Sequence, residues 1–129
     1  MIKFNELSIE AAEKILNSGV SLPLKDFLDS ALPISAERVN YYYEFGFVKI
    51  ENVIGKDFLP EVRKIIQASV LLRKGKDERE LKDKSQYEQS LLQCGFLCWD
   101  FPAVKDFVFA KRFAGIVRDL IKVDHVRLW

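Results

Sequence analysis

Histidine and cysteine are scarce in this sequence, and their scarcity limits the chemistry that the chain can carry. In 129 residues, His125 is the one histidine, and Cys94 and Cys98 are the two cysteines. A metal site with two histidine ligands therefore cannot be built from these side chains. Two cysteines four residues apart also give no disulfide framework, which favours a reducing compartment. We expect no metal ligand and no catalytic residue in this chain.

Long apolar runs, glycine-rich loops and a charge excess are missing as well. Nowhere do about 18 apolar residues follow one another, and the amino terminus has no apolar leader. The 6 glycines are dispersed, so a phosphate-binding loop is not indicated. The 20 basic and 19 acidic residues leave a net charge of +1, which favours neither nucleic acid nor an anionic membrane as a partner. We expect a cytoplasmic protein without these partners.

The residues that are present are those of a globular protein made mainly of helices. The sequence is 49% hydrophobic and 30% charged, which are ordinary globular values. Ser35 is a good N-cap for a helix that Gly46 ends, and residues 57–72 predict a longer helix. Residues 74–84 are charge-dense and predict a solvated connector. Further along, an apolar stripe predicts another helix through Ala110, Phe113, Ala114, Val117, Leu120 and Ile121.

Two short segments alternate with a period of two and predict strands. Val48 and Ile50 point one way after Gly46, and the alternation returns over Val123 to Trp129. In the second segment the residues of one face are His125, Arg127 and Trp129, and those of the other are Val126 and Leu128. The polar face either meets water at a sheet edge or lines a cavity, for which Arg127 and Trp129 are the candidate wall residues.

Together these elements predict an α+β fold, a mainly helical lobe with a few short strands. We interpret residues 1–129 as a single domain or lobe. Residues 1–34 form its N-terminal helical segment, residues 35–122 form helices with one short strand, and residues 123–129 form the first strand of a truncated sheet core.

Two groups of side chains allow two interpretations each. Cys94 and Cys98 are either soft metal ligands on one helical face or small core residues, and the core is favoured because free cysteine is usually buried. No spacing signature joins His125 to either cysteine as a proteolytic site. An aromatic cluster is either a stacking platform for bases or a sugar, or a set of core and helix-packing residues; its members are Tyr41, Tyr42, Tyr43, Phe45 and Phe47. The core is again favoured, because the cluster lacks interleaved basic residues.

Four runs of the chain resemble the amino-terminal portion of the phytanoyl-CoA dioxygenase family, in order and in spacing. The runs are Tyr43 to Ile54, the helix from Phe58 to Leu72, Phe101 to Val108, and Val126 to Trp129. The resemblance implies a double-stranded β-helix (jelly-roll) core preceded by helices. It also implies an oxygenase that uses Fe(II) and 2-oxoglutarate to hydroxylate a small organic or acyl substrate, with succinate and carbon dioxide as co-products.

The family's functional residues are not among these runs. In the family, a His-Asp-Gln run follows the strand that resembles Val126 to Trp129, and the His-x-Asp half of the iron triad, a distal histidine and a basic residue for 2-oxoglutarate come later. His125 precedes that strand and matches no ligand position. The resemblance therefore implies Fe(II) and 2-oxoglutarate for a full-length member, no cofactor in this chain, and a chain that is inactive alone.

A second hypothesis makes the chain a non-catalytic helical interaction module. Its segment from Val123 to Trp129 would then pair with a partner's sheet edge or with a second copy of the chain, because the apolar face of Val126 and Leu128 has nothing to cover it.

Overall fold

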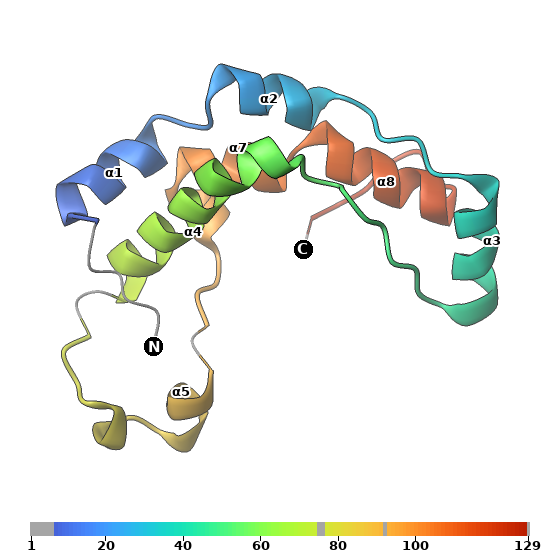
Figure 1. The fold of residues 1–129 in the computed structure, drawn as a ribbon. Helices are drawn as coiled ribbons and strands as arrows, with labels where there is room; N and C mark the ends of the chain where they lie inside the picture. Colours follow the sequence, from blue (N-terminus) through green and yellow to red (C-terminus); the bar gives the residue numbers. More distant parts are fainter. Residues whose placement is uncertain (1–6, 75–76, 92, 129) are drawn as a thin grey trace. The chain divides into compact units, whose positions relative to one another are not determined.

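The computed structural model describes residues 7–74, 77–91 and 93–128 (Figure 1). Within these ranges 64% of the residues are helical and none belongs to a strand. The fold is therefore all-helical, and the predicted α+β class is wrong. The chain divides into two compact units, and each is described here by itself.

Both predicted strands are irregular segments in the structure. Val48 to Ile50 follow the end of a helix without regular structure, and so do residues 123–128, while Trp129 lies outside the described residues. A strand exists only through hydrogen bonds to a neighbouring strand. The part of the chain that the structure describes offers neither segment such a neighbour, so alternation alone did not make a strand.

Unit 1 consists of the residues up to Gly19 together with Pro60–Lys105. It holds α1 (Ile9–Asn17), nearly all of α4 (Leu59–Lys74), η2 (Leu81–Asp83), α5 (Gln86–Ser90), α6 (Leu97–Asp100) and the start of α7 (Pro102–Val108). The Ser8 hydroxyl caps α1 by accepting from the Ala11 amide at 3.1 Å. The buried residues of unit 1 come from α1, α4 and α7 and are Ala12, Leu16, Val62, Ile65, Ala68, Ser69 and Ala103.

Unit 2 consists of Val20–Leu59 and Asp106–Trp129. It holds α2 (Leu22–Asp29), α3 (Ala36–Phe45), η1 (Lys56–Phe58) and α8 (Lys111–Ile121). The predicted ends of α3 are confirmed. The Ser35 hydroxyl accepts from the Arg38 amide at 3.3 Å, and Gly46 ends the helix in the left-handed conformation at φ 77°.

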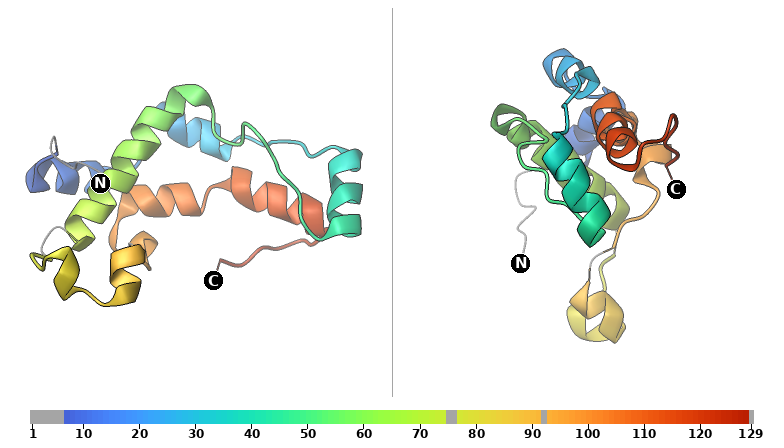
Figure 2. Two further views of the ribbon diagram at one scale, coloured as in Figure 1. Left: turned by 60° about the horizontal axis from the view of Figure 1, so that its bottom comes forward. Right: turned by 90° about the vertical axis from the view of Figure 1, so that its right-hand side faces the viewer.

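Helix α8 is the centre of unit 2, where it contacts both α2 and α3 (Figures 1 and 2). Its buried residues follow one another by four, at Arg112, Ile116 and Leu120. The predicted stripe is wrong in part, because Val117 and Ile121 are 39% and 38% exposed. The apolar residues of this helix therefore cover more than its buried face.

Arg112 ties three segments of unit 2 together. Its Nε donates to the Val53 carbonyl at 2.7 Å, and its Nη1 donates to the Ser30 hydroxyl at 3.1 Å and to the carbonyls of Ser30 and Ala31 at 3.3 Å each. The guanidinium also lies 4.3 Å from the centre of the Phe27 ring. One side chain thus joins α8 to the end of α2 and to the segment before η1.

Among the residues that the structure describes, none of the helices combines the length and the hydropathy needed to cross a bilayer.

Candidate functional site

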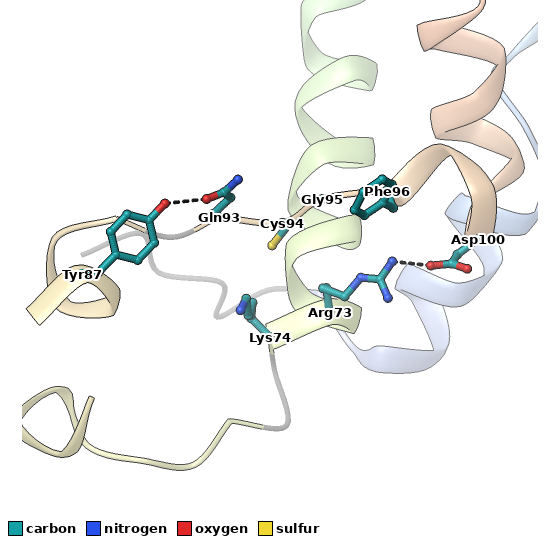
Figure 3. Close-up of a pocket in the computed structure, with 8 residues that line it drawn as sticks. All are labelled: Arg73, Lys74, Tyr87, Gln93, Cys94, Gly95, Phe96 and Asp100. Atoms are coloured by element: carbon teal, nitrogen blue, oxygen red, sulfur yellow. Dashed lines mark hydrogen bonds and ion pairs between the residues drawn. The ribbon is translucent and has the colours of Figure 1, made fainter. Parts of the chain in front are cut away.

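Unit 1 contains a hollow of about 600 Å³ beside the carboxyl end of α4 (Figure 3). We call it the α4 hollow. The residues that line it come from α4, α5, α6 and the segment between the last two, and are Arg73, Lys74, Tyr87, Gln93, Cys94, Gly95, Phe96 and Asp100.

The charges of the α4 hollow are partly neutralised within it. The Arg73 guanidinium forms an ion pair with the Asp100 carboxylate, and it lies 5.9 Å from the centre of the Phe101 ring. Lys74 is half-buried, and no ion pair joins it to a carboxylate of the described residues. The hollow therefore keeps one positive charge that a ligand can meet.

The far wall of the α4 hollow is polar at one end and aromatic at the other. The Tyr87 hydroxyl donates to Oε1 of Gln93 at 2.5 Å. Phe96 is 80% exposed and has a φ of 59°, in the left-handed region that a bulky residue seldom adopts. Gly95 faces open space, since an added Cβ would meet no atom within 4 Å. The residues at this end of the wall, Gly95 and Phe96, therefore pack against few other atoms.

The two cysteines lie on or near this hollow. Cys94 lines it and Cys98 follows in α6; both are free and both are half-buried. The prediction that Cys94 and Cys98 are buried core residues is therefore wrong. In the described residues, histidine, cysteine, aspartate and glutamate form no group of three that could hold a metal ion.

The predicted wall residues of a cavity are not brought to the α4 hollow. Arg127 is exposed in the irregular segment of unit 2, Trp129 lies outside the described residues, and His125 is exposed. Around the hollow the described side chains show no nucleophile hydrogen-bonded to a base. Among the described residues the hollow offers the positive charge of Lys74 beside two aromatic rings and no catalytic pair.

Next to the hollow, the charged connector is organised by Arg79. Its Nε donates to Asp77 at 2.8 Å, and its Nη2 donates to Glu88 at 2.7 Å. The hydrogen bond from Arg79, helped by one from Ser85, holds the pKa of Glu88 at about 2. The same guanidinium holds the pKa of Asp77 below its ordinary range, and the two carboxylates raise the pKa of Arg79. Arg79 is exposed, Asp77 and Glu88 are half-buried, and the three charges satisfy one another at the surface, as predicted for a solvated connector.

Four of the five side chains in the aromatic cluster of unit 2 are exposed and Tyr42 is half-buried, so the assignment of the cluster to the core is wrong. The exposed fractions are 42% for Tyr41, 56% for Tyr43, 52% for Phe45 and 62% for Phe47, and α3 has no buried residue. The sequence did contain a signal, because Tyr41 and Phe45 share a helical face with Glu37 and Glu44. Acidic neighbours on one face indicate a solvent-facing stripe.

Comparisons with protein-family models, with curated proteins and with solved structures find no significant match to this chain.

Proposed function

We propose that the chain is a helical part of an Fe(II)- and 2-oxoglutarate-dependent oxygenase similar to the phytanoyl-CoA dioxygenases, where it supplies framework to an enzyme that hydroxylates a small organic or acyl substrate. The observation that carries the proposal is the order and spacing of the four runs between Tyr43 and Trp129 that resemble the family. Two free cysteines fit the cytoplasm as its compartment.

The residues of this chain do not fit the iron of such an enzyme. A facial triad needs two imidazoles and a carboxylate that converge on one ion. The sequence has one histidine, and His125 is exposed. No step of the oxygenase reaction is therefore assigned to this chain, and the proposed role is the support of a sheet core.

The exposed apolar side chains of unit 2 support a framework role. Five of them lie on α8 and on the segment that follows it, and they are Val117, Ile121, Val123, Val126 and Leu128, each 38–47% exposed. Helices that cover a sheet bury such side chains against it. In the segment 124–128 no backbone hydrogen bond to another described residue is formed, which leaves its amides and carbonyls open to a neighbouring strand.

The reading frame beyond the Trp129 codon tests the family directly. We expect a His-Asp-Gln run to follow at once and a His-x-Asp run to come further on. A transcript that continues into an unrelated domain, or that stops there, would contradict the proposal.

An activity assay tests the framework role separately. The purified chain, supplied with ferrous ion and 2-oxoglutarate, should form no succinate above a protein-free control, because it lacks the second imidazole. Iron-dependent succinate formation by the chain alone would show that catalytic residues are present after all.

The exposed apolar face of α8 also favours a second function, that of an interaction module without catalysis. In that case the same five side chains and the segment 123–128 hold a second copy of the chain or another protein, and no oxygenase core is involved. A stable dimer in light scattering, together with a transcript that lacks the two histidine runs, would support the module.

A further inference from the structure

Helix α3 presents a stripe in which acidic and aromatic side chains are mixed. Glu37, Tyr41, Glu44 and Phe45 stand at positions i, i+4, i+7 and i+8, which lie on one face of a helix. All four are exposed, whereas the half-buried residues of α3, which contacts α8, are Arg38, Val39 and Tyr42. We call this surface the α3 stripe, and it includes Phe47, which packs against Tyr41 from beyond the helix end.

The rings of the α3 stripe are already assembled in the absence of a partner. The Tyr41 ring lies 4.5 Å from that of Phe45 and 5.7 Å from that of Phe47, the second pair meeting edge to face. Gly46 reverses the chain between the two phenylalanines with its positive φ. Side chains that support one another lose little conformational freedom when a partner binds.

The charges of the α3 stripe are negative and unpaired. No ion pair joins Glu37 or Glu44 to a cation of the described residues. Lys49 is paired with Glu51 at 2.8 Å, so that pair adds no net charge. Arg38 stands seven residues before Phe45, so it lies next to that ring at the edge of the stripe away from the two glutamates, and it is half-buried. Two carboxylates thus line one edge of three exposed rings.

This combination is complementary to a cation carried on an apolar segment. Carboxylates bind arginine or lysine, and the faces of tyrosine and phenylalanine attract the same cations while covering apolar side chains. Unit 2 already contains one such contact, in which Lys122 Nζ lies 5.1 Å from the centre of the Tyr43 ring. Phosphates of a nucleic acid would be repelled by the two glutamates.

We propose that the α3 stripe is a docking surface for a basic, apolar peptide segment of a partner protein. Arginine or lysine side chains of that segment meet Glu37 and Glu44, and its apolar side chains cover the rings of Tyr41, Phe45 and Phe47. The stripe shares no residue with the exposed apolar side chains of α8, so this inference does not depend on the oxygenase proposal.

Peptide titration of the whole chain tests the docking surface. The probe is a short synthetic peptide of arginine and leucine, followed by fluorescence anisotropy and by the amide signals of α3 in NMR spectra. Its matched control has glutamate in place of every arginine. We expect binding of the basic peptide alone, weakening as salt is raised because the attraction is partly electrostatic.

Variants of the chain locate the contact. The double variant Glu37→Gln/Glu44→Gln should weaken binding by about fivefold or more, and Phe45→Ala should weaken it to a similar extent. Tyr41→Leu keeps an apolar side chain without the ring and should show a smaller loss. The control Glu10→Gln/Glu13→Gln removes two exposed glutamates of α1 in unit 1 and should change the affinity less than about twofold.

Several outcomes would overturn the docking surface. They are equal binding of the acidic peptide, equal weakening by the α1 control, no binding of either peptide, and tighter binding of an RNA oligonucleotide than of the basic peptide. Circular dichroism of each variant shows whether α3 is retained, and Tyr41→Leu and the glutamine variants keep the proposal testable if Phe45→Ala unfolds.

Discussion

Arg112 is 7% exposed, yet the groups that hold it are neutral. Its hydrogen bonds within the described residues go to three backbone carbonyls and one hydroxyl, and its planar face lies on Phe27. The planar guanidinium of an arginine can donate hydrogen bonds to several carbonyls at once, whereas a lysine has a single ammonium group. The residue therefore acts as a cross-link between segments distant in sequence.

Removing this side chain should destabilise unit 2. In Arg112→Ala three carbonyls lose their donor, and we expect the free energy of unfolding to fall by about 3 kcal/mol. Arg112→Lys should lie between this variant and the parent chain. The control Arg118→Ala changes an exposed arginine of the same helix and should stay within about 0.5 kcal/mol. Urea denaturation measures all three, and equal losses at both arginines would contradict the cross-link.

Phe96 keeps a backbone conformation that suits glycine better. Its ring is 80% exposed, so little packing compensates for the positive φ. Phe96→Gly and Phe96→Ala both remove the ring, but only glycine relieves the backbone. We expect the glycine variant to be more stable than the alanine variant by about 1 kcal/mol, measured by urea denaturation. Equal stabilities would mean that residue 96 is not held in this conformation in solution.

At the scale of elements, the short helix α5 depends on a carboxylate with a lowered pKa. Ser85 and Glu88 form a capping box at its start, and Arg79 donates to the same carboxylate. The ordinary pKa of glutamate here is 4.5, and that of Glu88 is about 2. A lowered pKa in the folded state means that Glu88 stabilises the helix fully above about pH 4.5 and loses this effect as the pH falls towards about 2.

Acid should therefore open α5 before the helices with buried faces. Amide exchange at residues 85–90 should accelerate as the pH falls from about 4.5 to 2, relative to exchange in α4. Glu88→Gln should show the faster exchange already at neutral pH and should lose the pH dependence. An unchanged profile in this variant would show that another group controls the opening.

Helix limits could be predicted from the sequence better than helix faces. Ser35 and Gly46 mark the two ends of α3 by local chemistry, a hydroxyl that accepts an amide and a residue free to take a positive φ. The prediction misplaces the buried face of α8 because that face begins with Arg112, whose burial depends on carbonyls about 60 and 80 residues away. The strands failed for a similar reason, since pairing depends on a second segment.

The candidate sites were also only partly predictable. The solvated connector was recognised from its mixed charges, which satisfy one another locally. The α4 hollow was not, because Arg73 and Asp100 meet only through folding. The spacing of Glu37 and Tyr41 indicates the α3 stripe, but aromatic residues are buried so often that composition favours the core.

For the molecule as a whole, we expect the exposed apolar side chains of α8, Val117 and Ile121, to determine whether the chain associates. Replacing Val117 and Ile121 by glutamate should leave the helix content unchanged, because both side chains are more than a third exposed. We expect the free energy of unfolding to change by less than about 1 kcal/mol and the self-association of the chain to decrease. Light scattering over a range of concentrations measures the mass.

A matched control distinguishes the loss of apolar surface at Val117 and Ile121 from the change in net charge. Lys111→Glu alters the net charge by the same two units at a position whose side chain is 78% exposed on the same helix. It should leave the association unchanged. A parent chain that stays monomeric at every concentration would contradict self-association through this face.

The backbone conformation of Gly46, which ends α3, limits the amino acids that this position can accept. An added Cβ at Gly46 would meet nothing within 4 Å, so size places no limit on this position, while its φ of 77° places a strict one. In a saturation library at residue 46, peptide affinity should follow the left-handed propensity of each amino acid, with asparagine next after glycine, and should ignore side-chain volume. The φ angle of residue 46 would then determine whether Phe47 lies against the rings of Tyr41 and Phe45. Substitutions at this position could therefore change the affinity for the peptide in small steps, although residue 46 itself does not contact the peptide.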